Sequence, residues 1–175
     1  NKTRPYNTAN PELTYSVNGL QGTDTLESIG LDPAISTDAT LTSPVGDYDI
    51  TVDGPLAQGN YTVGYTKGTL TVVANSEDLT VTATGYNGVY DAASHNGVID
   101  ATASLEGATI TYSLEEDGVY TSAIPQVTDV TAGTVIWVKA TLPNYVDAKT
   151  SVTAKVTPAA LTIAAHNKTR PYNTA

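Results

Sequence analysis

The sequence predicts an all-β protein, and three observations support this prediction. Thr, Val, Asp, Tyr and Gly are frequent, whereas Lys and Glu are sparse, which is typical of strands and turns. Apolar side chains recur at every second position over many short segments, as they do when one face of a strand is buried. Gly, Asn, Asp and Pro cluster between these segments, where they favour turns.

In the first half, the alternating segments are 13–17, 48–52, 61–65 and 70–72. Each one directs one set of side chains into a core and the other toward water. Lys67 and Gly68 lie between two of these segments. Because Gly readily adopts positive φ, this pair predicts a two-residue hairpin turn.

One short helix is expected near 24–29. Asp24 and Glu27 have the spacing of a capping box, and Gly30 follows as a stop signal. The segment is short, so we expect one or two turns.

In the second half, the alternating segments are 79–83, 110–114, 135–140, 152–156 and 161–165. The segment 135–140 is apolar on nearly both faces, which predicts a central strand. The short segments and frequent turns favour two small tandem antiparallel β domains, sandwich-like, Ig-like or β-grasp-like.

The nine residues 167–175 repeat residues 1–9, Asn-Lys-Thr-Arg-Pro-Tyr-Asn-Thr-Ala, at an offset of 166 residues (167 minus 1). Such a repeat predicts a tandem array. We expect domains at 1–75 and 76–158, followed by the start of the next repeat at 159–175. The alternating stretch 159–166 comes just before the second copy of the motif. It is therefore expected to be the opening strand of that copy, and the domain 1–75 is expected to receive its opening strand from a preceding repeat.

The composition limits the possible functions. The net charge of −10 argues against nucleic acid, which needs a basic face, and favours a soluble surface polymer. No apolar run reaches about 18 residues, so this segment is not expected to insert into a membrane. The absence of Met indicates an internal segment of a longer chain, and the absence of Cys excludes disulfides and thiol catalysis.

No catalytic motif is present, so we expect no enzyme. His95 and His166 do not lie in a nucleophile motif. No cofactor is expected, with calcium at the junction acids Glu77 and Asp78 as the alternative, since hard cations bind clustered oxygens.

Four tyrosines close to predicted loops are candidate ligand-binding residues, because aromatic faces with polar tips suit sugars. They are Tyr86, Tyr90, Tyr120 and Tyr145.

Residues 1–73 resemble the MBG modules of large bacterial surface proteins. The resemblance rests on Lys2-Thr3-Arg4-Pro5-Tyr6, Gly46-Asp47-Tyr48, Gly59-Asn60-Tyr61 and Gly68-Thr69-Leu70-Thr71-Val72. The sequence departs from the family at Asn7, where Gly is usual, and at the inserted Thr23. Residues 79–157 resemble an Ig-like module of similar proteins through Tyr86-Asn87-Gly88-Val89-Tyr90-Asp91 and Val135-Ile136-Trp137-Val138-Lys139-Ala140.

The resemblance implies a tandem structural module of an extracellular fibre or of the stalk of a giant adhesin at the cell surface. Cell adhesion and biofilm formation would be its context. The expected partners are neighbouring repeats, other copies of the fibre and surface glycans. The alternatives are a glycan- or mucin-binding adhesin domain, an accessory module of a secreted enzyme, and filaments that exchange the strand 159–166 between chains.

Overall fold

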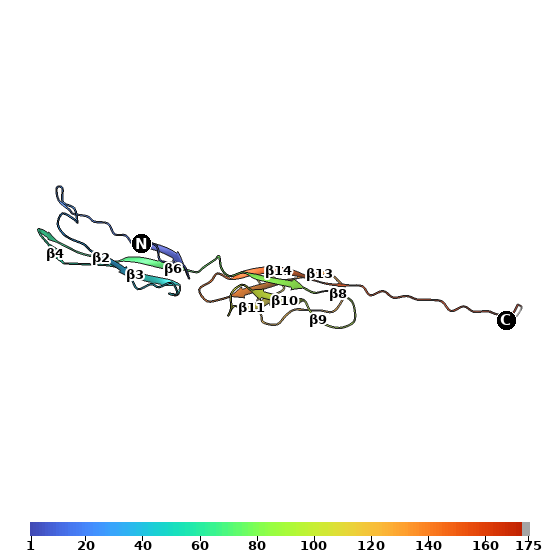
Figure 1. Cartoon of the computed structure of the whole chain (residues 1–175). Coiled ribbons are helices and arrows are strands. Elements are labelled where there is room, and N and C mark those ends of the chain that lie inside the picture. The colour runs from blue at the N-terminus through green and yellow to red at the C-terminus, as the bar shows by residue number, and fades with distance from the viewer. Residues whose placement is uncertain (173–175) are drawn as a thin grey trace. The chain divides into compact units, whose positions relative to one another are not determined.

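The computed structural model describes residues 1–172 and contains strands but no helix in that range. The all-β prediction is confirmed (Figure 1). The strands are β1 (Lys2–Pro5), β2 (Ala34–Thr37), β3 (Gly46–Asp53), β4 (Ala57–Gln58), β5 (Tyr61–Thr62), β6 (Gly68–Val73), β7 (Val81–Gly85), β8 (Asn87–Val89), β9 (His95–Asn96), β10 (Val98–Ala103), β11 (Thr109–Ser113), β12 (Gln126–Val127), β13 (Thr131–Thr141) and β14 (Ala148–Thr157).

The chain divides into two compact units. The first comprises Asn1–Val81, Ala103–Ile110 and Lys139–Lys149, and the second comprises Thr82–Thr102, Thr111–Val138 and the chain from Thr150. The domain boundaries predicted at residues 75 and 158 stay a prediction.

The first unit is built around a four-stranded sheet with the order β1-β6-β3-β2 (Figure 1). Strand β3 is antiparallel to both β6 and β2, whereas β1 runs parallel to β6. Strand β14 is likewise parallel to β8. These two pairs depart from the antiparallel pairing expected for the domains, because in each a distant strand joins a strand of the same direction.

The core of this sheet is small. Ile50, Leu70 and Ala39 are buried together, and Leu13, Ile35 and Tyr48 pack against them while remaining partly exposed. Burial of Ile50 on β3 and of Leu70 and Val72 on β6 confirms the period-two pattern in these two strands.

The helix predicted near 24–29 does not form. Thr25 and Ser28 exchange reciprocal hydrogen bonds between each backbone N–H and the other's hydroxyl, at 2.9 and 3.1 Å. The turn then closes with the Leu31 N–H donating to Leu26 O, five residues back, and Gly30 has a φ of 68°. A positive φ ends the turn before a second one begins, and one turn does not repay the cost of helix nucleation.

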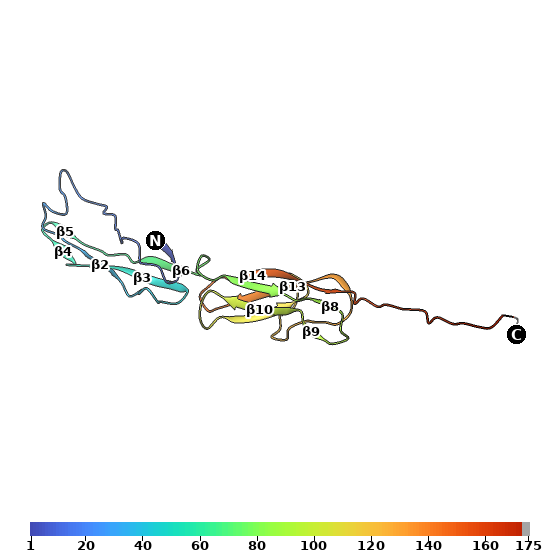
Figure 2. The same ribbon diagram turned by 45° about the vertical axis from the view of Figure 1, so that its right-hand side comes forward.

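Three alternating segments remain wholly or largely outside the strand ladders. They are 13–17, 161–165 and 61–65, and in the last of these only Tyr61 and Thr62 form a strand, β5. The hairpin turn predicted at Lys67 and Gly68 is wrong, because the chain runs from β5 into β6 without reversing direction (Figure 2).

The strands after residue 76 form a four-stranded sheet, β11-β13-β14-β8, and the pairs β10-β7 and β12-β9. Strand β13 lies inside its sheet, as predicted for 135–140. Its residues Ile136, Val138 and Ala140 are buried, with Val156 of β14 and Val98 of β10. Aliphatic side chains thus fill this part of the core.

Residues 158–172 form no strand and are exposed (Figure 1). Leu161 is 85% exposed and Ile163 is 88% exposed. Among residues 1–172, no helix is long and apolar enough to cross a membrane.

Candidate functional site

The sheet of the first unit bears an open groove of about 720 Å³. Ile50 and Val52 of β3 contribute to its lining, as do the segments 14–20 and 61–68. Asn1 and Lys2, at the start of β1, line it as well. The groove therefore lies next to the edge strand of the sheet.

The groove combines apolar surface with an unpaired stretch of backbone. Tyr15 and Val17 are exposed, and Val63 and Tyr65 are half-buried. The Val63 N–H donates to Leu56 O at 2.9 Å, but residues 63–67 belong to no ladder. An apolar groove beside unpaired backbone is suited to an extended segment that adds as a strand.

Tyr61 anchors one wall of the groove. Its hydroxyl donates to Asp24 Oδ2 at 2.6 Å and accepts from the Gln21 N–H at 3.0 Å. The hydrogen bond to the Asp24 carboxylate raises the pKa of Tyr61. The period-two pattern predicts that Tyr61 points into the core. This pattern does not show that the hydroxyl will hold a distant loop.

The buried Arg4 of the repeated motif has a structural role. Its Nε donates to Asn10 Oδ1 at 2.7 Å, its Nη1 donates to Pro5 O at 3.0 Å, and its Nη2 donates to Thr40 O. Asn10 in turn donates to Ala39 O at 2.6 Å. These bonds offset the cost of burying the guanidinium and hold β1 to the loop before β3.

Asn75, which follows β6, is buried at 3% exposure and makes a dense set of hydrogen bonds. Its side-chain nitrogen donates to Tyr6 O at 2.9 Å and to Asp78 Oδ2 at 2.8 Å, and its side-chain oxygen accepts from the Glu77 N–H at 2.9 Å. Its backbone bonds to Asn144 O and to the Val146 N–H, at 3.0 and 2.9 Å.

All of these residues belong to the first unit, so Asn75 fixes the chain inside it. The sequence predicts a domain boundary and a candidate calcium site at 75–78, but not the burial of Asn75. Short polar runs do not show in sequence whether they are solvated or buried.

Of the predicted metal ligands, Asp78 accepts a hydrogen bond from Asn75 through its carboxylate, whereas Glu77 enters the network through its backbone N–H. Within residues 1–172, no three His, Asp or Glu side chains form a group that could hold a metal ion. Calcium at these two acids stays a prediction, which a change of melting temperature on adding a chelator would test.

The four candidate tyrosines have separate surroundings. Tyr86 stacks on His95 with ring centroids 4.4 Å apart, and the Tyr120 hydroxyl donates to Glu116 O at 2.8 Å. Tyr145 packs edge-to-face on Tyr6 at 5.4 Å. Tyr90, at 39% exposure, is the most accessible of the four. A binding role for these residues stays a prediction.

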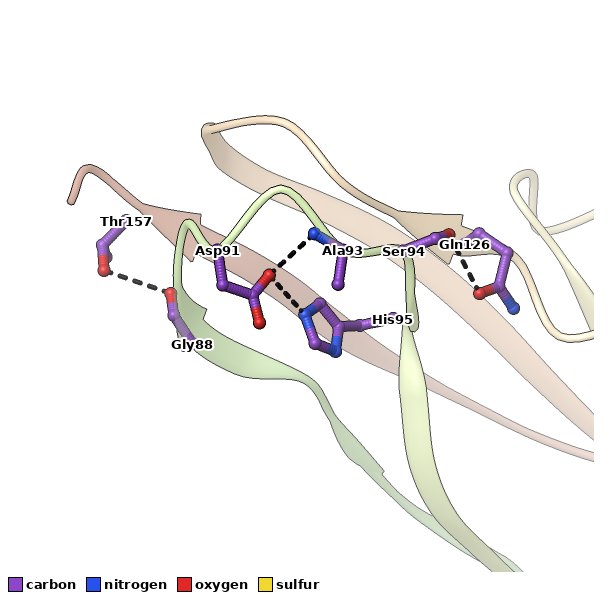
Figure 3. Close-up of polar contacts among 7 residues, drawn as sticks. All are labelled: Gly88, Asp91, Ala93, Ser94, His95, Gln126 and Thr157. Carbon is purple, nitrogen blue, oxygen red and sulfur yellow. Dashed lines mark hydrogen bonds and ion pairs between the residues drawn. The ribbon is translucent and has the colours of Figure 1, made fainter.

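The loop from β8 to β9 holds a polar corner in the second unit (Figure 3). The Asp91 carboxylate bonds His95 Nε2 at 3.0 Å and accepts from the Ala93 N–H at 2.9 Å. The hydrogen bond from His95, and then that from Ala93, lowers the pKa of Asp91. Thr157 Oγ1 donates to Gly88 O at 3.1 Å nearby, which ties the end of β14 to β8.

The described residues thus form an all-β chain, and the first nine residues of the sequence recur at 167–175. Residues 1–71 match the family model of the MBG domain (YGX type). This confirms the MBG resemblance, whereas the Ig-like resemblance of 79–157 stays a prediction. The MBG domain is a repeat module of adhesin-like surface proteins. No curated protein matches the chain.

The structure also explains the departure at Asn7, where the family usually has Gly. Asn7 has a φ of 59°. Gly adopts this left-handed region freely, and Asn tolerates it better than other residues do.

Proposed function

We propose that this chain is a tandem-repeat structural module of an extracellular fibre or of the stalk of a giant cell-surface adhesin. The observation that carries the proposal is the exact recurrence of residues 1–9 at 167–175 around a chain whose first 71 residues match the MBG domain. Stacked modules of this kind place what they carry at a distance from their anchor.

The acidic character of the chain suits this role. A net charge of −10 keeps neighbouring fibres apart and limits non-specific adhesion. The partners under this proposal are neighbouring repeats and other copies of the fibre, at the cell surface or in the extracellular matrix of a biofilm.

Arrays of one, two and four copies of residues 1–166 test the proposal. Their length should increase linearly, by very roughly 60–80 Å per copy for two domains built from strands of about eight residues. Small-angle scattering and electron microscopy measure this length. Arrays that collapse into compact particles, with no linear increase, would contradict the spacer function.

Glycan or mucin binding has weaker support. Tyr86, Tyr120 and Tyr145 are engaged in intramolecular contacts, which leaves Tyr90 as the most available face. Binding on a glycan panel that is lost in Tyr90→Ala, with the fold intact, would favour this alternative.

A further inference from the structure

We propose that residues 159–166 of one repeat complete the first domain of the following copy, where they lie in the groove as a parallel strand beside residues 61–68. The inference rests on the proposed tandem arrangement and specifies how consecutive copies are joined. The occupant is a segment of a second copy of this chain.

The first argument is the register of the edge strand. β1 pairs with β6 in parallel at an offset of 68 residues, with Lys2 opposite Leu70. In a tandem array, 159–166 directly precede the Asn167 that corresponds to Asn1. Subtracting the repeat of 166 and adding the register of 68 places Leu161 opposite Val63, and Ile163 opposite Tyr65, of the following copy.

The second argument is the pattern of burial along residues 61–72, beside which the added strand would lie. Val63 and Tyr65, which are half-buried, have odd numbers, whereas the buried Leu70 and Val72 have even numbers. The alternating pattern therefore shifts by one residue between 65 and 70.

Residues 161–170, which contain most of the added strand and the start of the next copy, show the same shift. The apolar residues Leu161 and Ile163 are odd-numbered, whereas Arg170, the counterpart of the buried Arg4, is even-numbered. Because both strands change phase within the same stretch, the parallel register aligns their inward faces on both sides of the shift.

The third argument is that residues 159–166 and residues 63–67 both lie outside the strand ladders. Leu161 and Ile163 are 85% and 88% exposed, and residues 63–67 belong to no ladder. The groove is lined by Asn1 and Lys2, the point from which a preceding strand would extend. One added strand would cover apolar side chains on both partners and pair the backbone of 63–67.

The test adds a copy of residues 158–166 directly before Asn1 of the full chain. The control carries the same addition with Asp in place of the counterparts of Leu161 and Ile163. With the apolar addition, amide exchange at residues 64–67 should slow at least about tenfold relative to the control. The thermal midpoint of the first domain should rise by several degrees.

Equal exchange rates in the two proteins would overturn the proposal. A two-copy array gives a second readout that does not depend on an artificial start. Leu161→Asp together with Ile163→Asp in the first copy should speed exchange at 64–67 of the second copy and leave 64–67 of the first unchanged. In the unmutated array, equal exchange rates at 64–67 of the two copies would also overturn it.

These measurements are separate from the length of the array. If arrays lengthen linearly but the added strand protects nothing, strand sharing is wrong and the spacer function stands. If the added strand protects 64–67 but arrays collapse, the spacer function fails and strand sharing stands.

Discussion

Residues 1–75 and residues 76–157 share the period-two pattern, but they differ in how completely the apolar face of their strands is covered. In the first region, a four-stranded sheet and the short antiparallel pair β4-β5 accompany a small core and an open groove of about 720 Å³. In the second, three sets of paired strands bury Val98, Ile136, Val138 and Val156 almost completely. The difference shows that alternation specifies which face is buried but does not supply the layer that buries it.

Both regions place tyrosines at the border between the core and water. Tyr48 and Tyr65 of the first region are only half-buried, and their hydroxyls donate to Pro44 O at 2.8 Å and Pro55 O at 3.1 Å. An aromatic ring with a hydrogen-bonded tip suits a boundary with water. Tyr120 of the second region is placed in the same way: it is half-buried, and its hydroxyl donates to Glu116 O at 2.8 Å.

The largest expected effect distinguishes the two cores directly. Ile136→Ala should cost about 2–5 kcal/mol, since it leaves a cavity in a sealed core. Ile50→Ala should cost less, about 1–2 kcal/mol, because Ile50 lines the open groove and its loss creates no closed cavity. Hydrogen exchange of strand amides in each region measures the two free energies. A greater loss for Ile50→Ala would contradict the comparison.

The next effect concerns the buried side-chain amide of Asn75, whose hydrogen bonds lie inside the first unit. Asn75→Ala removes the donors to Tyr6 O and Asp78 and the acceptor for the Glu77 N–H. Leaving buried groups unpaired should cost about 1–3 kcal/mol.

Ser76→Ala is the matched control for Asn75→Ala, since Ser76 is exposed. It should change stability by less than about 0.5 kcal/mol. Thermal unfolding measures both variants, and equal midpoints would show that the Asn75 network contributes nothing.

A smaller effect compares one left-handed residue from each region. Asn7 has a φ of 59° and Ala92 a φ of 66°. Asn7→Ala should cost about 1 kcal/mol, because Ala is disfavoured in this region of backbone space. Ala92→Gly should be neutral or stabilising by up to about 0.5 kcal/mol, since relief of strain is partly offset by the flexibility of Gly in the unfolded chain. Chemical denaturation measures both, and a stabilising Asn7→Ala would contradict the argument.

Much of the fold follows from the sequence, and the predicted strands that do not form share one cause. The segments 48–52 and 135–140 form strands where alternation predicts them. The segments 13–17 and 161–165 have an equally clear pattern yet form none. Period two describes the face of a strand, whereas a ladder also needs a neighbouring backbone, which a local pattern does not contain.

The candidate sites follow the same logic. Residue type suggested that Tyr86 and Tyr145 bind ligands, but the fold gives each ring an aromatic neighbour. Asn75 and Arg4 carried no sequence signal for burial, because polar residues are buried only where distant carbonyl groups can accept their hydrogen bonds.

The smallest expected effect concerns one exposed ion pair in each region. In the first, Lys67 Nζ lies 2.6 Å from Asp49 Oδ2, and in the second His95 Nε2 lies 3.0 Å from Asp91 Oδ1. The hydrogen bond to Asp49 raises the pKa of Lys67, and the hydrogen bond from His95 lowers the pKa of Asp91. The two pairs should therefore lose their contributions at opposite ends of the pH scale.

The stabilities of the two pairs depend on pH in opposite directions, because the pKa of Asp91 is lowered and the pKa of Lys67 is raised. A depressed carboxyl pKa contributes stability above the unfolded value of about 3.9, and this is lost as pH falls through the folded pKa of Asp91. Because the pKa of Lys67 is raised, its ion pair contributes stability below the unfolded value of about 10.4. This stability is lost as pH rises through the folded pKa of Lys67. In an NMR titration of the carboxyl carbon, His95→Gln should move the pKa of Asp91 upward. Retention of the Ala93 N–H bond should keep that pKa below the ordinary value, and an unchanged pKa in His95→Gln would show that His95 is not its main cause.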